Sequence, residues 1–379
     1  MAMAAEVGDV EGMSLSRSAM RSPYMQWAKL HSEARYNLAT SGVAGFPLSD
    51  LPVRLQDLEI NGPTVYGYAP LQDRLARKTG VRPECVVAAA GTSMANHLAM
   101  AATFEPGDEV LIEEPTYELL VSTAQYLGAE IRRFPRRFEE GFRLDPDAVA
   151  NRITSRTRLV VITNLHNPSG AYADAETLNR IGEIAKAARA RVLSDEVYLE
   201  TLFDQTWEPA YRLGPEFVVT SSLTKAYGLS GLRCGWILAE PELAARMWQI
   251  NDLYAATPAH PAELLSVIAL DNLDRIKARA KHLLDANRLN LNAFLDSQTA
   301  LECFRPAYGT TVFPKLSNGN VDEFCDVLKR NYETSIVPGC FFEMPSHFRI
   351  GIGGPHEMTA KAFERLAQAL DEFSKSGSK

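Results

Sequence analysis

The stretch RLVVITNLHNPSG, residues 158–170, shows the pattern that decides the fold. It begins with an apolar, β-branched run and continues into a polar, turn-forming segment, as expected for a buried strand that ends in a loop. Similar apolar runs lie at 108–114, 190–196 and 217–223, and segments with apolar residues at helical spacing, such as 175–190, separate them. This alternation predicts an α/β fold with a large, doubly wound, mostly parallel sheet covered by helices on both faces.

The sequence changes character beyond about residue 241. A long charged helical pattern covers 273–295, strand-like runs follow at 310–316 and 348–353, and an amphipathic pattern at 356–373 closes the chain. This order predicts a smaller α+β C-terminal domain. Roughly the first 20 residues are polar and contain glycine, and we expect them to be mobile or to form an arm. We divide the chain into an N-terminal arm and strap, a large domain, and a small domain that packs with the N-terminal segment: 1–45, 46–260 and 261–379.

Composition argues against several classes of partner. The 39 Lys and Arg residues against 47 Asp and Glu residues give a formal charge of −8, so we expect no nucleic-acid or acidic-membrane partner. We find no apolar run of membrane-spanning length and no secretory signal pattern. Five scattered cysteines without a CxxC pair fit reduced thiols, which predicts a cytoplasmic location. The seven histidines form no metal-binding motif, and we predict no metal site.

Polar and aromatic residues follow the predicted strands. In open parallel sheets, ligands bind at the carboxyl ends of the strands, so these residues are the candidates for a site. Each has an ordinary explanation when taken singly: a helix N-cap, a core aromatic residue, a turn or a surface charge. A carboxylate at the end of an apolar strand is the exception, because its burial is costly unless it meets a cation. The candidates are Gly91, Thr92, Ser93, Tyr117, Asn167, Asp195, Tyr198, Ser222, Lys225 and Arg233.

The order of four of these residues carries a family resemblance. Asparagine in NPSG, aspartate in DEVY and lysine in SLTK, with an arginine eight residues beyond the lysine, correspond to Asn167, Asp195, Lys225 and Arg233. This pattern resembles the class I/II aminotransferases, which are fold-type I pyridoxal-phosphate enzymes, and the resemblance extends from about Asn37 to the C-terminal helix. It implies transfer of an amino group from an L-amino acid to a 2-oxo acid by a ping-pong mechanism, through a Schiff base on Lys225.

The resemblance also implies roles for the cofactor-binding residues, and each role has a physical reason. Asp195 would pair with the protonated pyridine nitrogen, while Asn167 and Tyr198 would donate to the ring's O3′ atom. Tyr117 would stack on the ring. Lys225, Asp195 and Tyr198 are the predicted catalytic residues. The predicted phosphate ligands are a helix N-terminus, a hydroxyl and a guanidinium, supplied by Gly91, Thr92, Ser93, Ser222 and Arg233.

On the substrate side, the resemblance implies an arginine for the α-carboxylate. Arg349 in FRIGIG matches that arginine, and Asn167 can reach the same carboxylate. The N-terminal strap would line the substrate with Ser41 or Gly42, of which Gly42 is counted among the substrate-binding residues. The family's shared active sites imply a homodimer in which a neighbouring subunit lends a tyrosine to the phosphate, either Tyr66 or Tyr68.

The sequence leaves several functions and substrates open. The same cofactor residues serve a pyridoxal-phosphate-dependent lyase or cyclase acting by β- or γ-elimination. A non-catalytic module that senses the cofactor is a third alternative. We do not favour it, because such regulators carry a basic N-terminal winged-helix domain, whereas this chain is acidic and its sheet-forming region begins within about 90 residues. Residues 249–265, where dicarboxylate-specific relatives supply an extra arginine, contain none. This disfavours aspartate as substrate and leaves neutral or aromatic amino acids open, without identifying the donor, the acceptor or the pathway.

Overall fold

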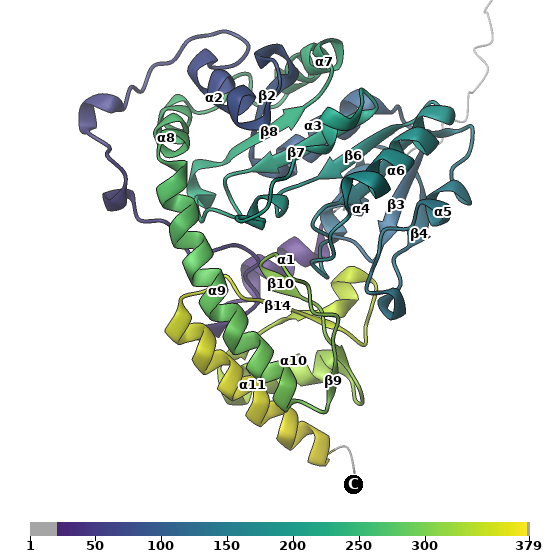
Figure 1. The fold of residues 1–379 in the computed structure, drawn as a ribbon, viewed down its shortest axis with the longest axis vertical. Helices are drawn as coiled ribbons and strands as arrows, with labels where there is room; N and C mark the ends of the chain where they lie inside the picture. The colour runs from purple at the N-terminus through teal and green to yellow at the C-terminus, as the bar shows by residue number, and fades with distance from the viewer. Residues whose placement is uncertain (1–20, 377–379) are drawn as a thin grey trace, which may run out of the picture.

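A mixed seven-stranded sheet forms the larger part of the molecule (Figure 1). The computed structural model describes residues 21–376, so the expectation for the first 20 residues lies outside the described part. The strand order across the sheet is β2-β8-β7-β6-β5-β3-β4. Their bounds are β2 Val86–Ala90, β3 Glu109–Glu114, β4 Glu130–Pro135, β5 Thr157–Thr163, β6 Arg191–Asp195, β7 Phe217–Ser222 and β8 Cys234–Leu238.

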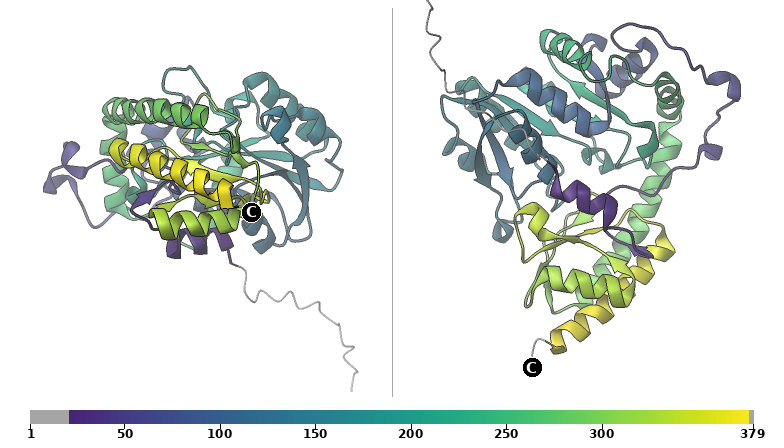
Figure 2. Two further views of the ribbon diagram at one scale, coloured as in Figure 1. Left: turned by 90° about the horizontal axis from the view of Figure 1, so that it is seen from below. Right: turned by 180° about the vertical axis from the view of Figure 1, so that it is seen from behind.

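Helices cover both faces of this sheet (Figures 1 and 2). Helix α3 packs across β2, β6, β7 and β8 and against α4, while α6 packs on β6. Because right-handed crossovers run in opposite directions along the sheet, α3 and α4 lie on one face and α6 on the other. The helices of this part are α2 Ala69–Thr79, α3 Gly91–Thr103, α4 Glu118–Tyr126, α5 Pro146–Ala150, α6 Ala175–Ala187, α7 Pro241–Asn251 and α8 His260–Asp271.

One strand departs from the parallel arrangement. Strand β8 runs antiparallel to both of its neighbours, β7 and β2. A parallel pair needs a crossover of about a dozen residues or more, and the connection 223–233 is shorter than that. The chain therefore turns back beside β7. As a result, both Lys225 and Arg233 lie at the same edge of the sheet as the carboxyl ends of β5, β6 and β7.

A second hydrophobic core lies below the large sheet in Figure 1. Helix α9 connects the two, since Ile276 packs in the first core and the residues from Ala280 to Leu295 pack in the second. Strand β14 lies between β10 and β13, β1 pairs with β12, and β9 pairs with β11. The elements are α1 Pro23–Leu30, β1 Tyr36–Asn37, α9 Leu273–Ser297, β9 Leu301–Glu302, β10 Thr311–Val312, β11 Lys315–Leu316, α10 Val321–Tyr332, β12 Thr334–Ser335, β13 Val337–Pro338, β14 Phe348–Gly351 and α11 His356–Ser376.

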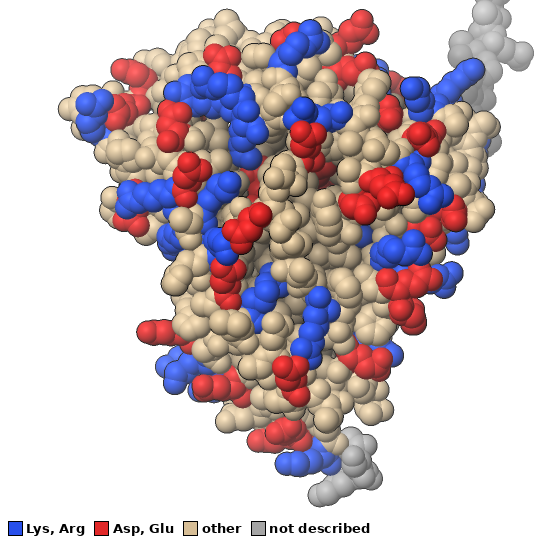
Figure 3. Space-filling view, viewed as in Figure 1, with Lys and Arg blue, Asp and Glu red and all other residues tan. Residues whose placement is uncertain are grey.

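The pairing of β1 with β12 ties the N-terminal segment to this second core. Tyr36 and Asn37 lie in register with Thr334 and Ser335. The second core includes residues from both ends of the chain. The exact domain boundaries given from the sequence stay a prediction. Basic and acidic side chains are interspersed over the face shown in Figure 3. Within residues 21–376, no helix is long and apolar enough to cross a membrane.

Candidate active site

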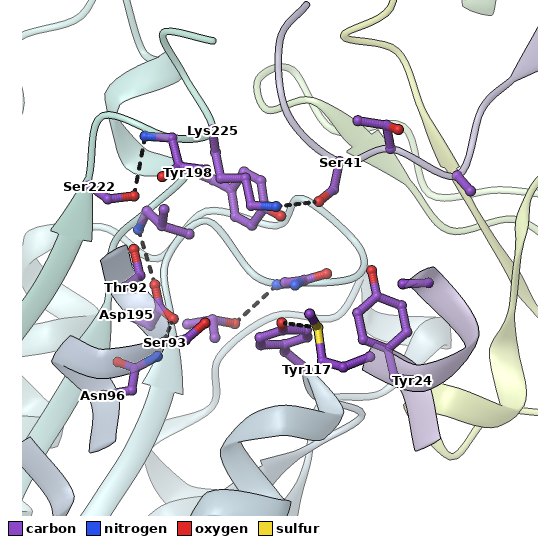
Figure 4. A pocket seen from close by; sticks show the side chains of 18 of the residues that line it. Tyr24, Ser41, Thr92, Ser93, Asn96, Tyr117, Asp195, Tyr198, Ser222 and Lys225 are labelled. Carbon is purple, nitrogen blue, oxygen red and sulfur yellow. Dashed lines mark hydrogen bonds between the residues drawn. The ribbon is translucent and has the colours of Figure 1, made fainter. Parts of the chain in front are cut away.

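A cavity of about 290 Å³ lies at the carboxyl ends of β5, β6 and β7, under the N-terminal segment (Figure 4). The strand ends supply Thr163, Asp195 and Ser222 to its wall. The cavity brings together most of the residues predicted from the sequence. Those that line it are Thr92, Ser93, Tyr117, Asn167, Asp195, Tyr198, Ser222, Lys225 and Arg233.

Asp195 is a buried carboxylate at the end of β6. Its Oδ2 accepts a hydrogen bond from Asn96 Nδ2 (2.8 Å), and its Oδ1 accepts one from the Val197 backbone N–H (3.1 Å). Thr220 on β7 holds Asn96 in place by donating to its Oδ1 (2.6 Å). Burial raises the pKa of Asp195 to about 6, since these hydrogen bonds and the charge of Lys225 offset only part of the lost solvation. The site therefore holds a buried acid that would gain from a cationic partner.

Lys225 supplies the amine of the cavity and is half-buried. Its Nζ donates to Ser41 Oγ at 3.0 Å (Figure 4), and Ser41 also interacts with the Tyr198 hydroxyl. Burial lowers the pKa of Lys225, and the guanidinium groups of Arg349 and Arg233 act in the same direction. Lys225 therefore loses its proton more readily than a surface lysine, and the neutral amine is the form that acts as a nucleophile or base.

Arg233 lies across the start of helix α3. Its Nη2 donates to the Ala90 carbonyl (3.0 Å). A Cβ atom on Gly91 would meet that same nitrogen at 2.2 Å, and a Cβ on Gly235 would meet the Gly91 carbonyl carbon at 2.5 Å. Gly91 also has a φ of +78°, which glycine adopts without strain. These contacts require glycine at both positions and place a guanidinium beside the free N–H groups of a helix N-terminus.

Hydroxyl groups complete this cationic end of the cavity. Thr92 Oγ1 and Thr224 Oγ1 are both buried and have no hydrogen-bond partner among the described residues. Ser222 Oγ accepts the Thr224 backbone N–H (3.3 Å), and Ser93 also lines the wall. Buried hydroxyls without partners are costly in a folded protein, so their grouping beside Arg233 indicates a site for a polar anion.

Arg349 on β14 is fully buried beside the cavity. Its Nη1 donates to Asn167 Oδ1 (3.0 Å), and its Nη2 donates to the Tyr24 hydroxyl (2.9 Å) and the Ala39 carbonyl (3.2 Å). Its guanidinium carbon also lies 5.1 Å from the centre of the Phe342 ring. These partners are neutral, and Nε has none among the described residues. The guanidinium is therefore held in place without being neutralised, as an anion-binding arginine should be.

Helix α1 closes the cavity on the side away from the sheet (Figure 4). Its residues Tyr24, Met25 and Trp27 line the wall, and the Tyr24 ring packs edge-on against Tyr117 with centroids 5.5 Å apart. The Tyr117 hydroxyl donates to Met25 Sδ (3.4 Å). This wall is aromatic and apolar, in contrast to the charged wall formed by the strand ends.

The N-terminal strap lines the cavity with Ser41, whereas the sequence prediction counted Gly42 among the substrate-binding residues. Ser41 lines the cavity and contacts Lys225, whereas Gly42 is absent from the lining within residues 21–376. A Cβ atom on Gly42 would lie 3.5 Å from the Lys225 Cα, so Gly42 packs against the backbone that carries the lysine. Substrate binding by Gly42 stays a prediction.

The two candidate tyrosines for a neighbouring site lie outside this chain's cavity. The Tyr66 hydroxyl donates to Asp252 Oδ2 (2.8 Å), and the Tyr66 ring stacks on Trp248. Tyr68 precedes α2 and packs edge-on against the His260 ring, with centroids 4.9 Å apart. Tyr66 is 55% exposed, which leaves it accessible to a second chain.

The residues of the site that sequence reasoning missed include Asn96, Thr163, Thr224 and Tyr24. Asn96 lies four residues after Thr92, and this helical spacing places both on one face of α3, which is a signal that could have identified it. Thr163 directly precedes the NLHNPSG segment, and Thr224 directly precedes Lys225. Tyr24 is distant in sequence from every other member, and we find no sequence signal that would have placed it there.

Comparison with known proteins identifies the family. A sequence model of the family Aminotransferase class I and II matches residues 56–366. The chain belongs to the class I and II aminotransferases. Pyridoxal phosphate is the cofactor of this aminotransferase, as the family and its solved structures indicate.

Individual relatives match over nearly the whole chain. Capreomycidine synthase of Streptomyces vinaceus is 29% identical over 92% of this chain and 93% of its own. Aspartate/prephenate aminotransferase of Thermus thermophilus is 28% identical over 86% of this chain and 90% of its own. A solved pyridoxal-phosphate-dependent aminotransferase from Streptococcus suis superposes with a TM-score of 0.88 at 27% identity, over 93% of this chain and 98% of that one. These matches confirm the predicted fold class and the predicted family.

The residues of this aminotransferase fit the cofactor chemically. The unpaired hydroxyls of Thr92 and Thr224, beside Arg233, suit a phosphate group. The buried carboxylate of Asp195 suits a protonated ring nitrogen, and the Lys225 amine, whose pKa is lowered, suits an aldehyde. The donor set therefore matches each polar end of pyridoxal phosphate.

The raised pKa of Asp195 predicts a pH-dependent stability difference in the cofactor-free protein. A carboxyl whose pKa rises on folding destabilises the folded chain once ionised, by about 3 kcal/mol for a rise from 3.8 to about 6. This penalty is absent below pH 3.8 and complete above about pH 6. Asp195→Asn cannot ionise, so its melting temperature relative to wild type should rise between pH 4 and pH 8, as thermal melts would show. The exposed Asp73→Asn is the control, and a pH-independent difference for Asp195→Asn would contradict the prediction.

Proposed function

We propose that this aminotransferase moves an amino group from an L-amino acid to a 2-oxo acid, with Lys225 as the residue that binds the cofactor covalently. The observation that carries the proposal is the arrangement of three charged groups around one cavity, of which Asp195 and Arg349 are buried and Lys225 is half-buried. Lys225 and Asp195 line it, and Arg349 lies beside it, bonded to Asn167 of the wall. They correspond to an attachment point, a partner for the ring nitrogen and an anchor for a carboxylate.

Each polar residue of the cavity has a proposed part in holding the cofactor. When bound, pyridoxal phosphate supplies an electron sink for a carbanion at the substrate's Cα. Asp195 would hold a proton on the ring nitrogen, and its bonds from Asn96 and Val197 keep the carboxylate oriented for that task. Tyr198 and Asn167 would donate to the ring oxygen, and Tyr117 would pack on the ring face. The proposed phosphate ligands are Gly91, Thr92, Ser93, Ser222 and Arg233.

Lys225 would also act as the proton-transfer residue. Burial lowers the pKa of its ammonium, which favours the neutral amine that can accept the proton of the substrate's Cα. Its Nζ lies in hydrogen-bonding distance of Ser41, so the amine has a defined resting position in the cavity. Tyr198 contacts the same serine and would help to hold that position.

Arg349 and Asn167 would bind the substrate's α-carboxylate. The guanidinium is fully buried, and its hydrogen-bond partners among the described residues, Asn167, Tyr24 and Ala39, carry no negative charge. A carboxylate would therefore supply the missing counter-charge in a site with low dielectric constant, where such a pair is strong.

The cavity favours a neutral substrate side chain. Among the described lining residues, the ionised groups are Asp195, Lys225 and Arg233, and all three have proposed parts in cofactor binding. The wall formed by Tyr24, Met25 and Trp27 of α1 with Tyr117 is aromatic or apolar, and the other described lining residues carry no charge. A second carboxylate on the substrate would be desolvated there without a cation, which is unfavourable. We propose neutral, including aromatic, amino acids as the substrate class.

A lyase or cyclase is the second candidate, because the capreomycidine synthase of Streptomyces vinaceus matches over nearly the full chain at 29% identity. The residues proposed to bind the cofactor would serve either reaction, so the geometry of the cavity does not separate the two. The aminotransferase reading is favoured by the family match and by the other relatives.

We propose a homodimer in which Tyr66 or Tyr68 reaches the neighbouring cavity. The segment before α2 runs along the outside of the molecule (Figure 1). Its side chains Leu55, Ile60 and Val65 are 81%, 85% and 60% exposed, and Leu253 is 80% exposed. Exposed apolar side chains of this kind are typical of surfaces that bind another chain.

A cytoplasmic location is proposed from the thiols. All five cysteines lie within the described residues and are free. Free thiols persist in a reducing compartment, where disulfides are rare.

Removing the Lys225 amine should abolish covalent cofactor binding. Lys225→Ala should lower the transamination rate by at least about 10³-fold, because both attachment and proton transfer are lost. Borohydride reduction followed by peptide mass spectrometry should find the cofactor on Lys225 of the wild type and none on the variant. The exposed Lys186→Ala on α6 is the matched control. Cofactor attached to another lysine in the wild type would refute the assignment.

The neutral wall predicts substrate preference. In a panel of amino acids and 2-oxo acids, kcat/KM for phenylalanine or methionine should exceed that for aspartate by at least about tenfold, since tenfold corresponds to only about 1.4 kcal/mol. Cofactor absorbance after single additions of amino acid measures the first half-reaction. Release of ammonia without transfer to a 2-oxo acid would favour the lyase, and a preference for aspartate would show that the wall is misassigned.

The exposed apolar surface predicts a dimer. Light scattering should give twice the mass of the chain, and the double variant Ile60→Glu/Leu253→Glu should dissociate. Loss of the neighbouring tyrosine should then weaken cofactor binding by about tenfold, the value of one good hydrogen bond to an anion. Leu289→Glu, which changes a 73% exposed leucine on α9, should leave both properties unchanged. A wild-type monomer with full cofactor affinity would argue against a shared site.

A further inference from the structure

A chain of hydrogen bonds connects a buried ion pair to the anion-binding arginine. Glu113 at β3 and Arg136 just after β4 are both fully buried, with Arg136 Nη1 2.8 Å from Glu113 Oε2. Glu113 Oε1 accepts both the backbone N–H (2.7 Å) and the hydroxyl (2.5 Å) of Thr163. Thr163 Oγ1 in turn accepts the Asn167 backbone N–H (3.0 Å), and Asn167 Oδ1 accepts Arg349 Nη1 (3.0 Å).

The direction of each hydrogen bond in this chain is fixed. Glu113 receives donors from Arg136 and Thr163, so its oxygens act as acceptors, as a carboxylate requires. The Thr163 hydroxyl must therefore point its proton at Glu113, which leaves a lone pair for the Asn167 N–H. The ion pair thus sets the orientation of the hydroxyl, and the hydroxyl sets the position of Asn167.

Asn167 is the contact that relates Arg349 to the large sheet. Within the described part of the chain, the other hydrogen-bond partners of Arg349 are Tyr24 and Ala39, both in the N-terminal segment. Asn167 instead follows β5, next to the strand that ends in Asp195. The separation between Arg349 and the buried acid therefore depends on where the Asn167 loop is held.

The far end of the same strands carries a similar group of residues that does not reach the cavity. There Glu109 accepts the Thr157 hydroxyl and Arg132 Nη1 (3.5 Å). Thr157 Oγ1 accepts the Thr154 backbone N–H (2.9 Å). Glutamate on β3, arginine from β4 and threonine on β5 thus recur at both ends of the strands. This second group provides a control within the same protein, because it has the same chemistry but no contact with the site.

We propose that Thr163, oriented by the buried Glu113–Arg136 pair, is a positioning residue that aligns Asn167 and, through it, Arg349 for the substrate's α-carboxylate. The inference rests on the proposed function, in which Arg349 binds that carboxylate. It assigns to Glu113 and Arg136 a part in substrate binding in addition to their packing within the sheet.

The test removes the hydroxyl and keeps the shape of the side chain. In the holoenzyme, Thr163→Val should raise KM for both the amino acid and the 2-oxo acid by about tenfold. It should lower kcat by less than that, because Asn167 is only one of the two proposed donors to the ring oxygen. Thr163→Ser, which restores the hydroxyl, should return KM to within about threefold of wild type. Thr157→Val should leave KM unchanged although it removes a comparable buried hydroxyl.

A double-mutant cycle separates this role from a general loss of stability. In an Asn167→Ala background, Thr163→Val should have no further effect on KM, because the two residues act through one contact. An equal effect in both backgrounds would overturn the proposal, as would an unchanged KM or a change in kcat alone. A similar rise in KM for Thr157→Val would show that Thr163 contributes packing rather than alignment of Asn167.

Binding measurements make the proposal independent of turnover. Calorimetric titration of the holoenzyme with 3-phenylpropanoate, which has a carboxylate and no amine, should show about tenfold weaker binding for Thr163→Val than for wild type. If Thr163→Val binds the probe more weakly than wild type but the wild type shows no transamination, the network is supported and the proposed function is contradicted. If the wild type transaminates and both proteins bind the probe equally, only the network is contradicted. If the wild type does not bind the probe, the assignment of Arg349 to the carboxylate is contradicted, and the network depends on that assignment.

Discussion

The burial of the Asp195 carboxylate is the constraint on which the site depends. A carboxylate at the end of an apolar strand loses its water, and the hydrogen bonds from Asn96 and Val197 restore only part of that solvation, so its pKa lies at about 6. Such a group is favourable only with a cation beside it. The surrounding structure keeps Lys225 in the same cavity without a direct ion pair, since the amine bonds to Ser41 instead. The acid is thus left available for a partner supplied by the bound cofactor.

The topology of the sheet delivers the remaining groups to that carboxylate. Strands β5, β6 and β7 are parallel, so Thr163, Asp195 and Ser222 meet at one edge. The short connection after β7 forces β8 to return antiparallel, and this return brings Lys225 and Arg233 to the same edge. The cationic end of the cavity therefore depends on a connection too short for a crossover, together with two glycines that let Arg233 cross the start of α3.

Local chemistry and order along the chain made most of the cavity predictable. Asp195 could be predicted because a buried carboxylate at a strand end is rare enough to demand a reason, whereas Lys225 was predicted from the ordered pattern that carries the family resemblance. The sheet was predicted from the apolar runs. The antiparallel direction of β8 and the wall formed by α1 could not be predicted, because they depend on loop length and on packing between residues far apart in sequence, such as Tyr24 against Arg349. The sequence could not decide between Ser41 and Gly42 for the same reason, since a shift of one residue along the N-terminal segment changes which side chain faces Lys225.

The two ends of β5 show how one chemical arrangement can serve different purposes. At the far end, Arg132 is 43% exposed, and hydrogen bonds from Thr157 and Thr154 help to lower the pKa of Glu109 despite its burial. At the cavity end, Arg136 and Glu113 are both fully buried, so the pair loses the solvation that the far pair keeps, and burial raises the pKa of Glu113. Apolar residues could fill the same volume at lower cost. The Glu113–Arg136 pair is therefore better explained by its hydrogen bonds to Thr163 than by a gain in stability. Thr163 in turn holds the Asn167 loop.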